Sequence, residues 1–336
     1  MRKIVKPLVA VLLLGVVVGA RTAAAQETLE QQAVLVRSAL ATLPPTAARR
    51  AFGAETTPAP GEPRVIGEYW KGCFVGGRQL PATGEHWQVM RLSRGRSWGT
   101  PRLVAFLERF SNIASEATGW PGILIGDMSQ PRGGPMLTGH ASHQLGIESD
   151  IWFRPMPKTP FERDQVDEVL SADLVRDDGR DVDPRVYNHQ HLALLKAAAM
   201  QPEVARVFVN AAIKKALCRD AGADRAWLRK IRPAAGHTYH FHIRLACPPG
   251  EADCIDQAPP AADDGCRELA SWLKNPPPKA RPGVPVAGTS LPMSAMPKAC
   301  QALARPGAPA RPAEPVELAR EKADLASPGA SRAAAR

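Results

Sequence analysis

The chain has 336 residues, a formal net charge of +10 and a hydrophobic fraction of 44%. This length accommodates one folded domain of ordinary to large size with appended segments, and the moderate positive excess suits an anionic polymer as a partner. The sequence shows no basic run with interleaved aromatic residues, which disfavours nucleic acid as that partner.

The N-terminal residues have the charge and hydropathy order of a secretory signal peptide. Basic residues lie within 1–6, an apolar stretch covers 8–20, and small residues follow at 22–25. We therefore expect residues 1–25 to be a signal peptide that is cleaved after Ala25, which also removes the chain from nucleic acid. The apolar stretch is short for a membrane span of about 20 residues, so a retained anchor is the weaker alternative. No later segment is long and apolar enough to cross a bilayer.

Six cysteines are present in a chain that we expect to enter an oxidising compartment. An even number of cysteines in that setting predicts three disulfides. Cys247 and Cys254 are close enough in sequence to close a small loop with each other. The sequence alone does not pair the other four, which are Cys73, Cys218, Cys266 and Cys300.

Composition divides the mature chain into three parts. Residues 26–64 combine an amphipathic stretch at 29–43 with a Pro/Ala-rich connector. Residues 65–275 have the apolar patterning of a folded domain. Residues 276–336 are rich in proline and alanine, a composition that cannot bury a core. We expect Cys300 to pin this last segment to the body at one point.

Helical and strand patterns are mixed within the body. Thr100 and Pro101 form a helix start, and apolar residues then recur at helical spacing along 103–110. Short apolar runs elsewhere predict strands, and longer periodic runs predict helices. The strands are expected at 123–125, 151–153 and 207–209, and the helices at 192–200 and 211–217. The mixture indicates an α+β fold in which helices surround a small central antiparallel sheet.

Two short segments together contain five of the eight histidines. In the second segment, the apolar residues Tyr239, Phe241 and Ile243 alternate with His240 and His242, which is strand periodicity. Residues two apart share one face of a strand. Both imidazoles are therefore expected to stand over one surface, while the apolar side chains fill the other.

The first segment contains His143 and Asp150, which are seven residues apart. A straight helix or strand does not bring such a pair to one ion, but Gly146 can supply a turn between them. The pair and one histidine of the second segment would give three ligands and an open position, as in catalytic Zn²⁺ sites. The other histidine would serve as general base, because zinc lowers the pKa of its water to about 7.

At these residues the sequence resembles the penicillin-insensitive murein endopeptidases, which belong to the zinc peptidases related to lysostaphin, D-Ala-D-Ala peptidases and hedgehog proteins. The wider signature is a histidine, an aspartate seven residues later, and a His-x-His, here at 240–242. The resemblance covers about residues 65–303 and includes all six cysteines. The matching stretches are GHASHQLGIESDIWF at 139–153, IGDM at 125–128, VFVNAAIK from 207, DRAWLRKIRP from 224 and HIRLACP from 242.

The resemblance implies a role for each residue of the site. The implied metal residues are His143, Asp150 and His242 as zinc ligands, with His140 lining the site beside them. His240 corresponds to the general base, and His237 to a second imidazole that steadies the transition-state charge. The implied disulfides are Cys73–Cys300, Cys218–Cys266 and Cys247–Cys254. The implied activity is hydrolysis, in the periplasm, of the D-alanyl–meso-diaminopimelyl cross-link of murein (peptidoglycan).

Three short motifs suggest other functions. Residues 95–99 fit G-x-S-x-G, so a serine hydrolase acting through Ser97 is an alternative, although a glycine-rich turn before a helix explains the pattern more simply. Residues 271–274 match S-x-x-K, but the S-D-N and K-T-G motifs of penicillin-binding proteins are missing. His189 and His191 form a second His-x-His at the start of a helix, where we expect them to be solvated.

Two alternatives use the same scaffold as the leading hypothesis. One is a non-catalytic murein-binding protein, and the other is a related D-Ala-D-Ala carboxypeptidase or dipeptidase. A second metal at 178–181 is disfavoured, because Asp181 stands where the family pattern has a histidine. The sequence does not determine the oligomeric state.

Overall fold

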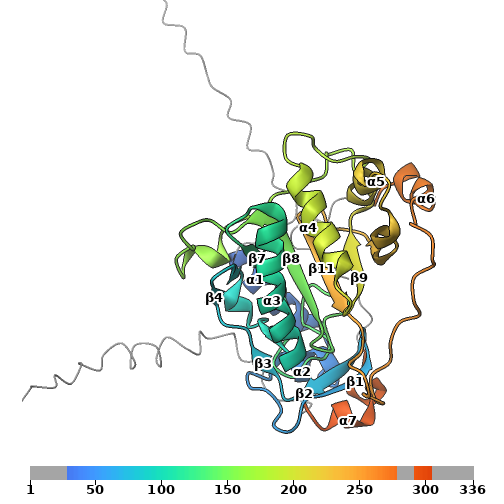
Figure 1. Ribbon diagram of the computed structural model, residues 1–336. Helices are drawn as coiled ribbons and strands as arrows, with labels where there is room; N and C mark the ends of the chain where they lie inside the picture. Colours follow the sequence, from blue (N-terminus) through green and yellow to red (C-terminus); the bar gives the residue numbers. More distant parts are fainter. Residues whose placement is uncertain (1–28, 278–290, 305–336) are drawn as a thin grey trace, which may run out of the picture.

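The computed structural model describes residues 29–277 and 291–304, and Figure 1 shows how their helices and strands are arranged. The predicted signal peptide lies outside the described residues, as does the C-terminal segment beyond residue 304. In the part of the chain that is described, no helix is both long and apolar enough to span a membrane.

A seven-stranded mixed sheet forms the centre of the fold. Its strands in spatial order are β10 (Ile231–Pro233), β9 (Val204–Val209), β11 (His240–Leu245), β8 (Glu148–Pro155), β7 (Ile123–Ile125), β5 (Trp87–Val89) and β4 (Thr83–Gly84). The four strands from β9 to β7 run antiparallel to one another, whereas β10 with β9 and β5 with β7 are parallel pairs. The α+β class and the antiparallel centre are confirmed, and the parallel pairs extend the sheet on both sides.

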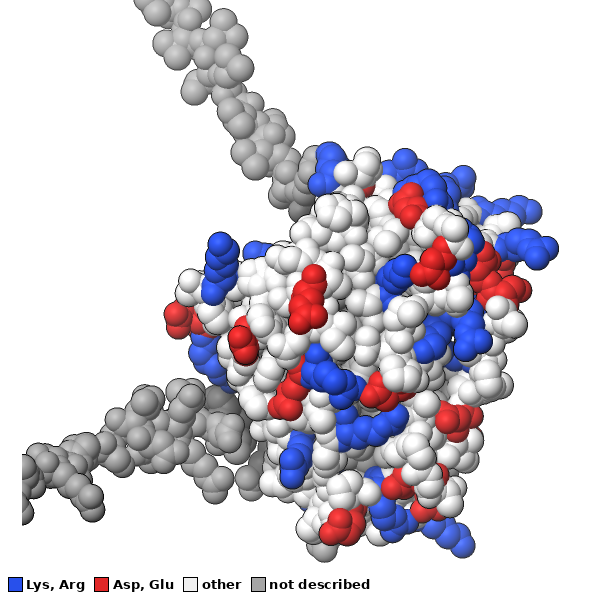
Figure 2. Space-filling view, in the orientation of Figure 1, with Lys and Arg blue, Asp and Glu red and all other residues white. Residues whose placement is uncertain are grey.

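Helices surround this sheet, as predicted. They are α1 (Leu29–Thr42), α2 (Ala48–Gly53), α3 (Pro101–Thr118), α4 (His189–Met200), α5 (Ala211–Asp220), α6 (Leu269–Lys274) and α7 (Lys298–Gln301). Short 3₁₀ turns are η1 (Leu92–Arg94), η2 (Gln165–Asp167), η3 (Ala226–Lys230) and η4 (Met293–Ala295). In Figure 1, α3 and α4 lie side by side across one face of the sheet. The molecular surface on that side carries basic and acidic side chains interspersed (Figure 2).

The start of α3 follows the sequence prediction closely. The Thr100 hydroxyl accepts a hydrogen bond from the backbone N–H of Leu103 at 3.2 Å, and Pro101 occupies the first helical position. These are the favoured residues for the two positions. Gly119 ends the helix with a φ of 70°, a left-handed conformation that glycine adopts without strain. Leu103, Phe106, Leu107 and Phe110, which recur at helical spacing, are buried in the main core.

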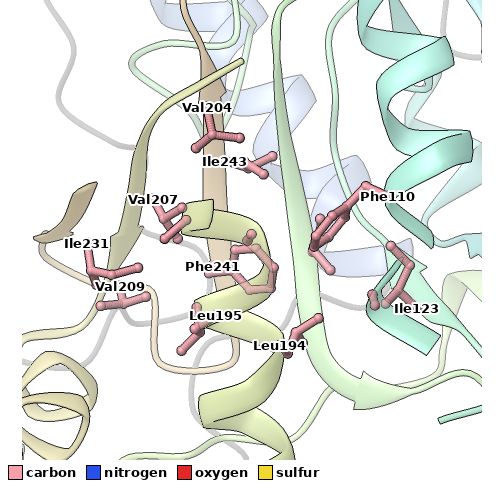
Figure 3. Close-up of a cluster of buried hydrophobic side chains, with 14 of the residues drawn as sticks. Phe110, Ile123, Leu194, Leu195, Val204, Val207, Val209, Ile231, Phe241 and Ile243 are labelled. Carbon is pink, nitrogen blue, oxygen red and sulfur yellow. The ribbon is translucent and has the colours of Figure 1, made fainter. Parts of the chain in front are cut away.

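The strand β11 separates an apolar face from a polar one. Phe241 and Ile243 are fully buried in the main core, and Phe241 lies near Leu194 and Leu195 of α4 (Figure 3). Because side chains alternate along a strand, the histidines of β11 point to the opposite face. The polar face of the sheet is therefore turned away from α3 and α4.

A second, smaller core lies beside the hairpin of β1 (Arg64–Glu68) and β2 (Lys71–Val75). It joins Phe52 of α2 to residues of the hairpin and of α7. Cys73 of β2 and Cys300 of α7 are buried in it and form a disulfide. A further pair of short strands is β3 (Arg78–Gln79) with β6 (Trp98–Gly99). The disulfide joins the helix α7 to the β1–β2 hairpin.

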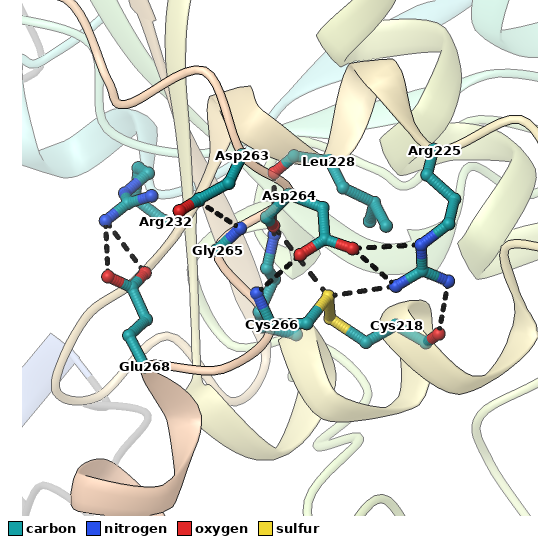
Figure 4. Close-up of a disulfide and its surroundings, with 10 residues drawn as sticks. Cys218, Arg225, Leu228, Arg232, Asp263, Asp264, Gly265, Cys266 and Glu268 are labelled. Atoms are coloured by element: carbon teal, nitrogen blue, oxygen red, sulfur yellow. Dashed lines mark hydrogen bonds and ion pairs between the residues drawn. A yellow bond between two sulfur atoms is a disulfide. The ribbon is translucent and has the colours of Figure 1, made fainter.

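The three disulfides join the pairs that the family resemblance implied, Cys73–Cys300, Cys218–Cys266 and Cys247–Cys254. Figure 4 shows how the second one ties α5 to the segment before α6. The Arg225 guanidinium binds the Asp264 carboxylate through two hydrogen bonds, of 2.7 and 2.9 Å. Beneath them, the buried Lys214 ammonium donates to two backbone carbonyls, and burial lowers its pKa to about 8.

The disulfides are expected to differ strongly in what they contribute to stability. Cys73–Cys300 spans 227 residues, whereas Cys247–Cys254 spans 7. Because the entropy removed from the unfolded chain grows with loop length, we expect replacing the first pair by serines to lower the free energy of unfolding by about 5 kcal/mol, and replacing the second pair by about 2 kcal/mol. Urea denaturation of the two double variants measures both values, and equal losses would contradict this account.

Candidate metal centre

The candidate site is built on the polar face of β8 and β11. In the antiparallel register of these strands, His242 lies directly opposite Asp150, and His240 lies opposite Trp152. Side chains of directly opposite residues share one face of a sheet and are within reach of each other. The pairing therefore brings the Asp150 carboxylate and both imidazoles of β11 to one place.

The loop before β8 brings His143 to the same place. Gly146 has a φ of 64°, and a Cβ there would come within 2.6 Å of the Phe74 ring, so this turn requires glycine. His143 itself has a φ of 64°, which is an unfavourable backbone conformation for a non-glycine residue. Its backbone N–H donates to the Glu148 carboxylate at 2.7 Å, which holds it there. Strained residues of this kind cluster at functional sites.

Three atoms of the site meet at short distances. His143 Nε2 lies 3.4 Å from Asp150 Oδ1 and 3.1 Å from His242 Nδ1, and the latter two atoms are 3.8 Å apart. The nitrogen Nε2 of His140 lies 3.7 Å from the other carboxylate oxygen of Asp150. Among the described residues, His140, His143 and Asp150 form a group that could hold a metal ion.

Hydrogen bonds from outside fix which nitrogen of each ring faces the centre. His143 donates from Nδ1 to the backbone carbonyl of Met128 at 2.6 Å, and His242 donates from Nε2 to Glu148 at 2.7 Å. When both rings are neutral, the nitrogens that face each other and Asp150 therefore carry lone pairs. This is the usual way in which outer partners orient metal-binding histidines.

The donor set fits a zinc ion. Ligand atoms of a four-coordinate zinc ion are about 3.4 Å apart, close to the three distances between His143, Asp150 and His242. Asp150 Oδ1 is a buried oxygen without a hydrogen-bond partner in the described part of the chain. A buried acceptor in this state is costly unless a cation or donor meets it.

A short segment after β7 holds three groups of the site at once. The backbone N–H of Gly126 donates to the Asp150 carbonyl at 2.8 Å, and the backbone N–H of Asp150 donates to the Asp127 carbonyl at 2.9 Å. The carbonyl of Met128, the next residue, accepts the hydrogen bond from His143 Nδ1. The Asp127 carboxylate accepts a hydrogen bond from His140 at 2.9 Å. These residues belong to the IGDM motif at 125–128, and holding the site residues in position is a structural reason for that motif.

Three buried carboxylates lie in or next to the site, and they differ in the side chains that balance their negative charge. Asp127 forms ion pairs with Arg94 at 3.1 Å and Arg96 at 2.9 Å, and Glu148 pairs with Arg244 at 2.7 Å. The ion-pair partners of Asp150 in the described chain are imidazoles. Burial acts to raise the pKa of all three carboxyls, but the arginines beside Asp127 and Glu148 and the imidazoles around Asp150 outweigh it and hold each pKa below its usual range. Asp150 is thus an ionised carboxylate whose charge a metal cation can balance.

The remaining two histidines lie beside this group. His240 Nε2 is 3.6 Å from Asp150 Oδ2, and its Nδ1 is buried without a hydrogen-bond partner in the described chain. Burial lowers the pKa of His240 to about 3, so the ring is neutral near pH 7. His237, with a φ of 52°, places its ring centroid 5.0 Å from that of His240. The structure therefore brings all six predicted site residues together.

Sequence reasoning missed Asp127 and Glu148. Neither stands in the His-x-His or is one of the spaced His/Asp pair, and only the folded structure shows that Asp127 contacts His140 and that Glu148 contacts His143 and His242. One feature of the sequence could have indicated them: each is an acidic residue within or next to an apolar stretch that folds as a buried strand.

The residues set aside on sequence grounds are engaged elsewhere. The Ser97 hydroxyl is buried and accepts a hydrogen bond from the Gln79 amide, and Asp181 is neutralised by Lys215 and Arg219. The prediction of solvated histidines at the start of α4 is wrong for His191. That ring is buried, accepts from the Asn188 backbone N–H in a capping interaction and bonds the Phe153 carbonyl.

The fold and site define an α+β protein that gathers histidines and an aspartate, as a metal-ion site requires, on the polar face of its sheet. Residues 65–305 match the family model described as penicillin-insensitive murein endopeptidase, and the chain belongs to that family. A relative of that name from Yersinia pestis bv. Antiqua is 43% identical over 266 residues, which cover 79% of this chain and 94% of the relative. Another, from Klebsiella pneumoniae subsp. pneumoniae, is 45% identical over 249 residues, covering 74% and 88%.

The role of Glu148 as an orienting residue predicts a loss of metal affinity in Glu148→Gln. The glutamine amide has no negative charge to accept the hydrogen bond from His242 and to balance Arg244. We therefore expect zinc affinity to fall by about 10- to 100-fold. Competition with a chromophoric chelator measures this. Glu203→Gln, which removes a carboxylate paired with Arg109 of α3, is the matched control. Unchanged affinity in Glu148→Gln would contradict the role.

Proposed function

We propose that the protein is a zinc-dependent murein endopeptidase that is exported to the periplasm and hydrolyses the D-alanyl–meso-diaminopimelyl cross-link. One observation carries the proposal. A buried carboxylate oxygen of Asp150 without a hydrogen-bond partner in the described chain lies within 4 Å of two imidazole nitrogens, and the other nitrogen of each ring is hydrogen-bonded to an outside acceptor. Family membership supports the substrate, and the three disulfides are typical of a protein that enters an oxidising compartment.

The zinc ion would be held by His143, Asp150 and His242, with His140 beside them. A bound zinc ion would supply Lewis-acid chemistry: it would polarise a peptide carbonyl and lower the pKa of water enough for a base to convert it into a nucleophile near neutral pH. The chain supplies the rest of the site. Glu148 and the Met128 carbonyl orient the two imidazoles, so little rearrangement is needed when the ion binds.

His240 would act as the general base. Its side chain retains only 12% exposure, and its imidazole lies beside the proposed ligand Asp150, within reach of a group bound there. Its Nε2 faces the carboxylate of Asp150, so the positive charge that follows proton uptake would form beside a negative one. His237, packed against it, would steady the negative charge that develops on the reacting carbonyl oxygen.

This mechanism accounts for the name of the family. Penicillin inhibits enzymes by acylating a serine nucleophile. The proposed reaction uses water and histidine in place of such a serine, and Ser97 is buried with its hydroxyl on Gln79. Retention of every proposed ligand and of the base argues against a murein-binding protein without activity.

Digestion of cross-linked murein tests the proposal. We expect the mature protein to convert cross-linked dimers to monomers, chelation to abolish the reaction, and added zinc to restore it. His240→Ala should lower kcat by about 100- to 10,000-fold, the usual contribution of a general base. His189→Ala is the matched control, because His189 is an exposed histidine at the start of α4.

Product analysis by chromatography and mass spectrometry distinguishes the outcomes. Persistence of the dimers with zinc demonstrably bound would refute the endopeptidase assignment. Release of terminal D-alanine alone would favour the related carboxypeptidase, which uses the same metal chemistry. Full activity of His240→Ala would remove that residue from the mechanism and leave the substrate assignment intact.

A further inference from the structure

The tip of the β1–β2 hairpin exposes a tryptophan. Trp70 retains 46% exposure, whereas the neighbouring Tyr69 is fully buried. In the described part of the chain, the other large apolar side chains with comparable exposure are aliphatic: Val34, Met200 and Ile255. An indole ring held in solvent beside a buried tyrosine is a platform that a ligand can cover.

The hairpin tip is hydrogen-bonded to the loop that carries His140 and His143 of the candidate metal centre. The side-chain amide nitrogen of Gln144 donates to the backbone carbonyl of Trp70 at 2.8 Å and to that of Ala141 at 3.2 Å. Its oxygen accepts a hydrogen bond from the backbone N–H of Gly72 at 3.2 Å. Gln144 directly follows His143, and Ala141 is an exposed residue between His140 and His143. One amide group thus clamps the tip against the loop that carries two site histidines.

A second connection keeps the tip rigid. The guanidinium of Arg244 lies 4.1 Å from the centroid of the Tyr69 ring, and the Tyr69 hydroxyl bonds the Asp256 carboxylate at 2.7 Å. Arg244 also binds Glu148, the residue that orients the ring of His242. Since these partners fix the hairpin before any ligand arrives, little conformational entropy is lost when one binds.

We propose that Trp70 is a saccharide-binding subsite that holds the glycan strand of murein while the peptide cross-link occupies the metal centre. The inference rests on the proposed function, which supplies the polymer. Pyranose rings present a flat face of C–H groups, and an indole covers such a face without needing charged partners. The peptides of murein are small or charged at most positions, so the sugars are the part of the polymer that matches a broad, uncharged aromatic platform.

Binding of peptide-free glycan strands, prepared from murein by amidase digestion, tests the subsite directly. We expect Trp70→Ala to weaken binding by about tenfold, the loss typical of truncating a tryptophan anchor, and Trp70→Phe to retain most of the affinity. Chelation of the metal should leave this binding unchanged. Met200→Ala, at the end of α4 on the other side of the sheet, is the control. Equal binding by wild type and Trp70→Ala, or none by wild type, overturns the proposal.

Kinetics on two substrates separates this subsite from the catalytic proposal. With intact sacculi, Trp70→Ala should lower kcat/KM about tenfold, mainly through KM, whereas a cross-linked peptide dimer without sugars should be affected less. Equal losses on both substrates would show a general structural effect and overturn the subsite. If wild type cleaves neither substrate, the proposed function fails, and the glycan-binding measurement still decides the role of Trp70.

Discussion

The register between β8 and β11 places His242 opposite Asp150, and the candidate site depends on this one pairing. Side chains alternate along both strands, so a slip by one residue would move the imidazoles into the core and turn Phe241 toward solvent. The buried Phe241 and Ile243 oppose that slip, because both side chains belong to the main apolar core in the observed register. The core of the protein thereby fixes the geometry of its polar site.

Around this pair, the chain surrounds Asp150 with groups that are themselves held in place. The backbone of 126–128 binds the backbone of Asp150 and the ring of His143, while Arg244 and Glu148 hold His242. Two neighbouring carboxylates have arginine partners, and Asp150 faces imidazoles. The arrangement leaves one buried negative charge for which a metal cation is the natural counter-ion.

The parts of this site that follow from local periodicity could be predicted from the sequence. Alternation around His240 and His242 predicted a strand with both rings on one face, and Gly146 predicted the turn that returns the chain to Asp150. The pairs Cys73–Cys300 and Cys218–Cys266 could not be derived from spacing and came from the family resemblance. Asp127 and Glu148 were missed, because their contacts with His140 and His242 form only when separate segments of the chain come together. His191 was misjudged for the same reason, since packing against β8 buries it.

The central claim is that this group of side chains is a zinc site, and X-ray absorption at the zinc edge on the purified mature protein tests it most directly. The account predicts one zinc ion per chain with two imidazole ligands and one carboxylate ligand. It also predicts that the histidine contribution to the spectrum falls when His143 is replaced by alanine. A protein that binds no zinc after reconstitution, or whose zinc spectrum is unchanged by His143→Ala, would contradict the account.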